Sequence, residues 1–155
     1  MRINCIDVCD LTDQHLRAEW VEFLMLEPYI RRSINSKNGL ILSDSKTYVL
    51  GSGHARFFYD KLSYVKNRYL QLEGELKKRG VNTNPTLRLE NLQQSLYNDW
   101  TPTREDKINN LNRIITRIAL KPKWYKFHKK EIEDWVSFYE KKYEFSYSFH
   151  PSHQG

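Results

Sequence analysis

Residues 11–23, with the sequence LTDQHLRAEWVEF, decide how this 155-residue chain folds, because they contain the complete start of an amphipathic helix. Three apolar side chains recur at three- and four-residue intervals and predict its buried face: Leu16, Trp20 and Phe23. Thr12 is a natural N-cap, and Leu11 and Leu16 occupy the two positions of a hydrophobic staple. We therefore predict a helix that begins at about Asp13.

The same helix carries a stripe of titratable side chains, because His15, Glu19 and Glu22 are spaced i, i+4 and i+7. His15 lies near the positive end of the helix dipole, which favours its neutral form. The stripe has two interpretations, a functional cluster or a solvated acidic face with a local His–Glu pair. Spacing alone favours the solvated face.

Composition limits the class of protein. A chain of this length forms one domain with a modest core. No apolar run reaches the length of a membrane span, and the start of the chain lacks the apolar stretch of a signal peptide, so we expect a cytoplasmic protein. Cys5 and Cys9 are then expected to be free thiols. No Cys/His pair has metal-ligand spacing, so neither a metal nor another cofactor is expected.

Charge is unevenly distributed along this basic chain, which has a net charge of +6 and a pI near 9.3. The local balance is −4 over residues 1–30, +7 over residues 31–80 and +7 over residues 104–130. Two basic blocks around an acidic first helix suggest a surface that binds a polyanion such as nucleic acid. Ordinary solvated helix faces explain the charges equally well.

Three more helices are predicted from apolar periodicity, after a first helix that Pro28 kinks or restarts before it ends near Ile34. A second helix spans about residues 60–79 and ends before Gly80, a third begins at Thr103 with Asp106 three residues on and stops at Pro122, and a tail helix spans about residues 131–143. The predicted buried side chains are Leu62, Val65, Tyr69, Leu72 and Leu76 in the second helix, Ile108, Leu111, Ile115 and Ile118 in the third, and Ile132, Trp135, Val136 and Tyr139 in the tail.

Arg113 and Arg117 are four residues apart in the third helix and predict an exposed basic stripe that Lys121 prolongs. Residues 123–130, KWYKFHKK, then interleave aromatic side chains with cations. This pattern suits stacking on bases while phosphates are neutralised. Aromatic side chains in the core with lysines left in water are an equally good interpretation.

No segment reads as a strand, so the predicted class is all-α. We expect a compact single-domain bundle of three main helices plus a C-terminal helix, with the amino terminus packed against the first helix. The segment with glycines at positions 51 and 53 lacks the Lys-Ser/Thr ending of a phosphate-binding loop, so we predict a turn there.

Several blocks of the sequence, taken together and in order, resemble the phage pyrimidine-dimer DNA glycosylase (endonuclease V) family. They are Arg2-Ile3-Asn4, Asp13-Gln14-His15-Leu16, Ala18-Glu19-Trp20 with Glu22, Gly51-Ser52-Gly53-His54 through Leu62, Lys78-Arg79-Gly80, and Pro122-Lys123-Trp124-Tyr125-Lys126. The resemblance covers residues 1–130, which we expect to form a glycosylase-like domain. Residues 131–155 are expected to be an extension that packs on the same domain.

The resemblance implies a DNA repair enzyme that needs no metal, with combined glycosylase and AP lyase activity. Such an enzyme excises cyclobutane pyrimidine dimers through an imine with its N-terminal α-amine and nicks the strand by β-elimination. It implies Met1 as the source of the amine, Glu22 as the acid/base group and His15 as its support. The implied DNA contacts are Arg2, Gln14, Arg31, Arg32, Arg113, Arg117, Lys121, Trp124 and Tyr125. The expected partner is damaged or modified double-stranded DNA, bound by a monomer.

Two departures from the family pattern leave alternatives open. Arg2 follows Met1 directly, whereas the phage prototype of the family has a threonine between them. Met1 is therefore expected to be retained and to supply the amine. Val21 and Met25 stand where the prototype has arginines beside the catalytic glutamate. The alternatives are therefore a related glycosylase/AP lyase for another damaged or modified base, and a non-catalytic DNA-binding module.

Overall fold

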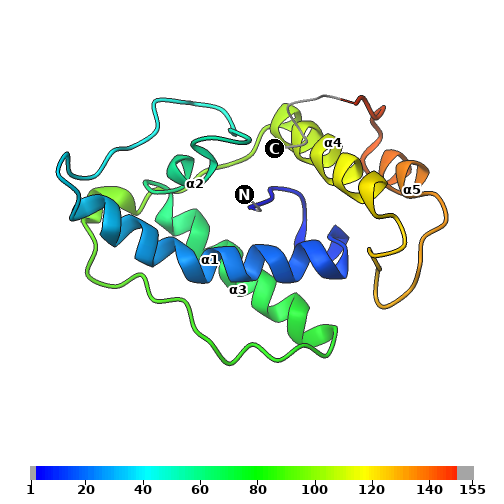
Figure 1. Cartoon of the computed structure of the whole chain (residues 1–155), viewed down its shortest axis with the longest axis horizontal. Helices are drawn as coiled ribbons and strands as arrows, with labels where there is room; N and C mark the ends of the chain where they lie inside the picture. Colours follow the sequence, from blue (N-terminus) through cyan, green and yellow to red (C-terminus); the bar gives the residue numbers. More distant parts are fainter. Residues whose placement is uncertain (1–2, 150–155) are drawn as a thin grey trace.

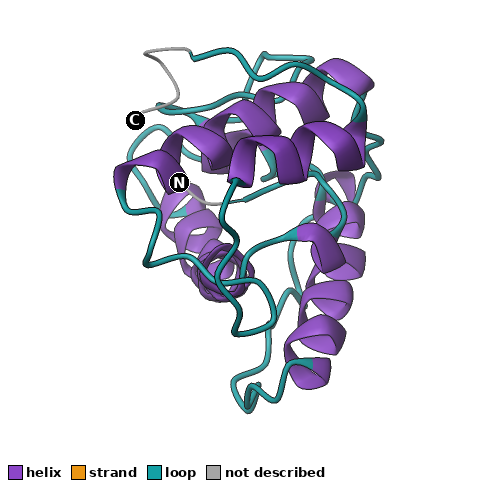
Figure 2. Cartoon of the chain, turned by 90° about the vertical axis from the view of Figure 1, so that its right-hand side faces the viewer, coloured by secondary structure: helices purple, strands orange, loops and turns teal. Residues whose placement is uncertain are grey.

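The computed structural model describes residues 3–149, in which helices are connected by loops and no β-strand occurs (Figures 1 and 2). The predicted all-α class is confirmed. The elements in chain order are η1 (Val8–Asp10), α1 (Asp13–Ile34), α2 (His54–Phe57), α3 (Leu62–Lys78), η2 (Gln94–Leu96), α4 (Arg104–Leu120) and α5 (Trp135–Tyr143). No helix in the described part of the chain is long and apolar enough to cross a membrane.

Helix α1 begins as predicted, because the Thr12 hydroxyl accepts a hydrogen bond from the backbone N–H of His15 at 3.0 Å. The predicted restart at Pro28 does not occur, since one continuous helix runs to Ile34. Pro28 is exposed, whereas Leu26 and Ile30 on either side of it are fully buried. Burial on both sides holds the helix together, and water can satisfy the carbonyl that proline leaves unpaired.

Helices α3 and α4 also follow the predicted pattern. All five residues predicted for the stripe of α3 are buried, and Gly80 ends the helix with a positive φ of 79°. Thr103 and Asp106 form a capping box at the start of α4. Leu111, Ile115 and Ile118 are buried as predicted, while Ile108 is half-buried. Helix α5 begins at Trp135, later than predicted, because Asp134 caps it.

The start of the chain runs as an extended segment through the middle of the molecule, between α1 and α4 (Figure 1). It pairs with no strand, so its backbone polar groups need other partners, and side chains supply them. The backbone of Asn4 donates to Glu19, those of Cys5 and Ile6 donate to Asn110 at 2.8 and 3.2 Å, and the carbonyl of Ile6 accepts from Arg68 at 2.5 Å. The predicted packing of the chain start against α1 is observed from residue 3 onward.

Helix α5 holds the next part of the chain start, residues 7–10. Asp10 pairs with Lys142 at 2.9 Å and accepts a hydrogen bond from the Tyr143 hydroxyl at 2.6 Å. The Tyr139 hydroxyl donates to the Asp10 carbonyl at 2.7 Å. The helix beyond residue 130 therefore contacts the first ten residues directly, although its status as an extension of a 1–130 domain stays a prediction.

The ion pair between Glu19 and Arg68 gives the first testable prediction. Both side chains are buried, with 2.7 Å between Glu19 Oε2 and Arg68 Nε. We expect Arg68→Met to lower the free energy of unfolding by about 3–5 kcal/mol in chemical denaturation, because it leaves a buried carboxylate without its charge partner. The control is Lys77→Met in the same helix, which removes an exposed pair with Glu73 and should cost less than about 1 kcal/mol. Equal losses in the two variants would contradict the prediction.

Candidate functional site

The carboxylate of Glu19 fixes the position of the chain start on α1. One oxygen accepts the backbone N–H of Asn4 at 2.6 Å, and both oxygens accept from Arg68. Arg68 in turn donates to the carbonyl of Ile6, so a single buried ion pair holds the segment at two points. Glu19 therefore has a structural role in the core, and the interpretation as a solvated face is wrong for this residue.

Glu22 follows Glu19 by three residues, so the two side chains project from the same face of α1. Glu22 is half-buried, and its Oε1 atom is fully enclosed without a hydrogen-bond partner among residues 3–149. A buried carboxylate oxygen without a partner is costly. It is an available proton acceptor one helical turn beyond the point where the chain start crosses α1.

A cavity of about 500 Å³ brings together six of the residues that the sequence singled out. They are Gln14, His15, Arg113, Arg117, Trp124 and Tyr125, and Arg17, Ala18 and Val21 complete the lining. The rings of His15 and Tyr125 stack with their centroids 4.7 Å apart, and Nδ1 of His15 lies 2.7 Å from the Thr12 hydroxyl. The cavity therefore combines cationic and aromatic side chains from α1, α4 and the loop that follows α4.

The structure corrects the expected basic stripe on α4. Arg113 is buried, with only 6% of its surface exposed, Arg117 is half-buried and Lys121 is exposed. The two arginines face the interior because this side of α4 packs against the rest of the molecule. Both arginines line the cavity.

The remaining predicted DNA contacts lie elsewhere. Arg31 and Arg32 are exposed near the end of α1, about 25 Å along the helix axis from Gln14. Arg31 pairs with Glu27 and donates to the Glu90 carbonyl at 3.0 Å. Met1 and Arg2 lie outside the described residues.

The loop after α4 is fixed to the start of α1, which settles how its aromatic residues divide. The side chain of Gln14 accepts the backbone N–H of Lys126 at 2.8 Å, and Asp13 accepts those of His128 and Lys129. Phe127 packs against Phe138 of α5, whereas Trp124 is 63% exposed. Packing of the aromatic residues in the core is therefore observed for Phe127, while stacking of Trp124 on bases stays a prediction.

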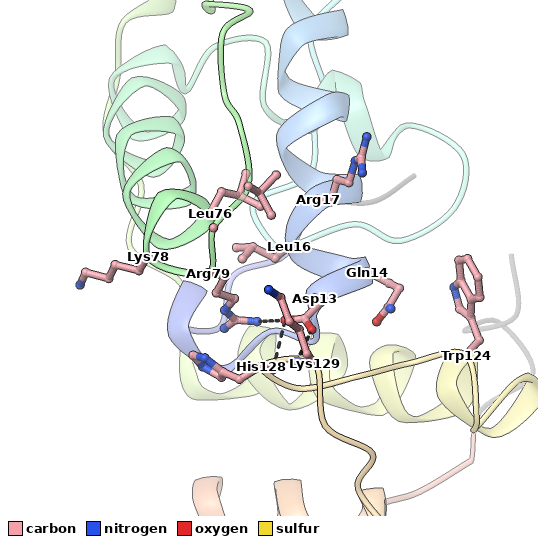
Figure 3. A pocket seen from close by; sticks show the side chains of 12 residues that line it. Asp13, Gln14, Leu16, Arg17, Leu76, Lys78, Arg79, Trp124, His128 and Lys129 are labelled. Atoms are coloured by element: carbon pink, nitrogen blue, oxygen red, sulfur yellow. Dashed lines mark hydrogen bonds and ion pairs between the residues drawn. The ribbon is translucent and has the colours of Figure 1, made fainter.

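A second cavity, of about 610 Å³, lies beside the first and shares three lining residues with it: Gln14, Arg17 and Trp124 (Figure 3). Its walls are the start of α1, the end of α3 and the loop at residues 128–129. Asp13 is the acidic residue of its lining and is paired with Arg79 at 2.9 Å (Figure 3). The rest of the charged lining is basic, so the hollowed surface around Trp124 suits an anionic ligand.

Sequence reasoning assigned no role to His54, which contacts the chain start. It is buried, its Nε2 atom accepts the backbone N–H of Ile3 at 3.1 Å, and its Nδ1 atom lies 2.5 Å from the Val49 carbonyl. Burial, together with the charge of Arg113, lowers the pKa of His54 from an ordinary value of 6.5 to about 4. The ring is therefore neutral at physiological pH.

The buried pair of Glu19 and Arg68 could have been found from the sequence, because both charged residues lie on apolar helix faces. Glu19 lies three residues after Leu16 and four before Phe23, within the predicted buried arc. Arg68 lies three after Val65 and four before Leu72. Charged side chains at such positions need buried partners. No group of His, Cys, Asp and Glu in the described part of the chain is arranged to hold a metal ion.

Comparison with known families agrees with this geometry. The family model described as pyrimidine dimer DNA glycosylase matches residues 1–89, which is more than half of the chain. The chain belongs to the pyrimidine dimer DNA glycosylase family. The matched residues include the chain start, α1 with Glu19 and Glu22, the loop that carries His54, and α3 with Arg68 and Arg79. The suspected family is confirmed, and DNA is the substrate of that family.

The lowered pKa of His54 gives a prediction for this glycosylase. Between pH 6.5 and about 4 the unfolded chain binds a proton at His54 and the folded chain does not, so the stability that the neutral ring contributes is present above pH 6.5 and is lost as the pH falls. The groups around the ring are Tyr48, Phe58, Arg113 and the backbone of Ile3.

The measurement is the free energy of unfolding at several pH values between 7.5 and 4.5, for the native chain and for His54→Gln. We expect the difference between the two proteins to shrink as the pH falls through this range, because glutamine does not titrate. A difference that is constant with pH would contradict the assignment.

Proposed function

We propose that this glycosylase also has AP lyase activity and excises cyclobutane pyrimidine dimers through an imine formed by its own N-terminal α-amine. The observation that carries the proposal is the fixed path of residues 3–6 across α1 at Glu19, one helical turn before Glu22 and its buried oxygen without a partner. Met1, retained because Arg2 follows it, supplies the amine.

An α-amine is the most available amine nucleophile in a protein near neutral pH. Its pKa is about 7.7–8.0, against about 10.4 for lysine, so a usable fraction is uncharged. Two residues span at most about 7 Å, so an amine two residues before Ile3 stays within that distance of a fixed point. The held backbone of Ile3 supports this role.

The proposed reaction uses the amine and one carboxylate. The nitrogen lone pair attacks C1′ of the damaged nucleotide, the bond from C1′ to the base breaks, and loss of a proton from nitrogen with opening of the sugar gives the imine. Removal of a C2′ proton then expels the 3′ phosphate. Glu22 stabilises the positive charge that develops on the sugar and transfers the protons. His15 supports it from the same helix.

The proposed DNA surface is centred on the cavity lined by His15, Arg113, Arg117 and Trp124. Arginines neutralise phosphates, and exposed aromatic rings stack on bases. Gln14 and Tyr125 complete this surface, and Arg2, Lys121, Arg31 and Arg32 are proposed to contact DNA backbone further away. The chain is proposed to act as a monomer in the cytoplasm.

A second candidate function keeps the chemistry and changes the base. Val21 and Met25 are 43% and 41% exposed on α1, on either side of Glu22 in the sequence, and Val21 lines the cavity. Such exposed apolar side chains suit a base that differs from the thymine dimer, such as another lesion or a modified base. A module that only binds DNA is the remaining alternative.

Borohydride trapping tests the proposed chemistry. We expect a covalent protein–DNA adduct on UV-irradiated duplex but none on undamaged duplex, because borohydride reduces an imine. Glu22→Gln should lower the adduct yield at least 100-fold, while Glu27→Gln, the same change farther along α1, should leave it unchanged.

Each other outcome of the trapping assay identifies an alternative. An adduct on DNA with modified bases but not on UV-irradiated DNA would select the second candidate. Salt-sensitive binding without an adduct on any lesion or abasic site would contradict the lyase proposal and leave a binding module. Mass spectrometry of the intact chain tests the retention of Met1.

Trp124 gives a prediction for DNA affinity. We expect Trp124→Ala to raise the Kd for damaged duplex about 10-fold, because stacking on one base contributes about 1–3 kcal/mol. The matched control is Leu70→Ala on α3, since Leu70 and Trp124 are both 63% exposed. Binding is measured at a fixed salt concentration. Equal Kd values for the two variants would contradict the proposed surface.

A further inference from the structure

Both backbone polar groups of Ile3, its N–H and its carbonyl, are held by side chains from the segment between Tyr48 and His54. Nε2 of His54 accepts the Ile3 N–H at 3.1 Å, and the hydroxyl of Tyr48 donates to the Ile3 carbonyl at 2.5 Å. Both side chains are buried, and their rings contact each other edge to face with centroids 5.4 Å apart. Ile3 is itself fully buried.

The surroundings of His54 fix its protonation and its orientation. Its Nδ1 atom can only donate to the Val49 carbonyl, so Nε2 carries the lone pair that accepts from Ile3. Phe58 packs edge to face on the same ring with centroids 5.6 Å apart. Burial keeps its pKa far below physiological pH, so the acceptor is preserved throughout the working range.

We propose that His54 and Tyr48 are positioning residues for the N-terminal nucleophile. The inference rests on the proposed function, because it concerns the same amine, and it assigns the placement of this amine to a segment outside α1. Neither side chain needs to touch the substrate. Their shared task is to fix the backbone of Ile3, from which the first two residues of the chain extend.

Removal of the hydrogen bonds to Ile3 has a different expected effect from removal of the hydrogen bonds to residues 4–6. Glu19, Asn110 and Arg68 hold residues 4–6 and would keep the segment in the core without Ile3 being fixed. Loss of the His54 bond frees the peptide unit between residues 2 and 3, and loss of the Tyr48 bond leaves the unit between Ile3 and Asn4 held by Glu19. An amine two residues before Ile3 then samples a larger volume. Such a change slows attack on C1′, because covalent steps depend on the distance and angle of approach, while DNA binding is left intact.

Three variants test the inference in the full-length chain: Tyr48→Phe, His54→Leu and His54→Gln. The measured quantities are the single-turnover rate of borohydride trapping at saturating UV-irradiated duplex and the Kd for that duplex. We expect Tyr48→Phe and His54→Leu to lower the rate about 10–100-fold with a Kd within about threefold of the native chain. His54→Gln should recover a part of the rate, because its carboxamide oxygen can accept the Ile3 N–H.

The matched control is Tyr97→Phe. Tyr97 also donates its hydroxyl to a backbone carbonyl, that of Leu89, which belongs to a loop outside the cavity and outside the chain start. We expect its trapping rate to equal that of the native chain. Thermal unfolding of every variant verifies that the compared proteins are folded, and Tyr48→Phe, which removes one oxygen atom, keeps the test valid where His54→Leu does not fold.

The outcomes separate this inference from the proposed function. A native chain that forms no adduct contradicts the proposed function itself. A native chain that forms the adduct, with Tyr48→Phe reacting at the rate of Tyr97→Phe, contradicts only the positioning role. A rate in His54→Gln as low as in a folded His54→Leu, or a loss that resides in Kd, also overturns it.

Discussion

The buried ion pair between Glu19 and Arg68 is the interaction on which the rest of the structure depends. A carboxylate and a guanidinium removed from water must satisfy each other and their remaining hydrogen-bonding groups, or the fold loses several kcal/mol. Here the remaining groups are met by the backbone of Asn4 and Ile6. The pair thus specifies where the chain start crosses the interior. It also joins α1 to α3, which contact each other more extensively than any other pair of described elements.

This arrangement solves a problem of an all-α fold that buries an extended chain start. An extended segment in the core has unpaired N–H and C=O groups, and a helical protein has no neighbouring strand to pair with them. Side chains from four separate regions take that role: Glu19, Tyr48 with His54, Arg68, and Asn110. Together they hold backbone groups of every residue from Ile3 to Ile6, so the path of the segment is determined residue by residue.

The sequence predicted the parts of this structure that depend on local rules. The caps of Thr12 and Thr103, the apolar stripe of α3 and the glycine after it follow from periodicity and hydrogen-bonding capacity within a few residues. The resemblance to the family also named six of the residues that line the cavity around His15 and Trp124. Burial of Arg113, the continuity of α1 through Pro28 and the role of His54 depend on contacts between distant segments, which spacing does not encode.

The chain start is also held from the opposite end of the sequence. Lys142 and Tyr143 of α5 meet at the carboxylate of Asp10, and the Tyr143 hydroxyl accepts the backbone N–H of Asp7 at 3.2 Å. Arg79 donates to the carbonyls of Cys9 and Leu11 from the end of α3. Side-chain contacts therefore hold the segment of residues 3–11 along its length, from Ile3 to the first turn of α1. Because the same contacts stabilise the fold and fix the chain start, a loss of rigidity in α3 or α5 also loosens the segment that Glu19 and His54 hold.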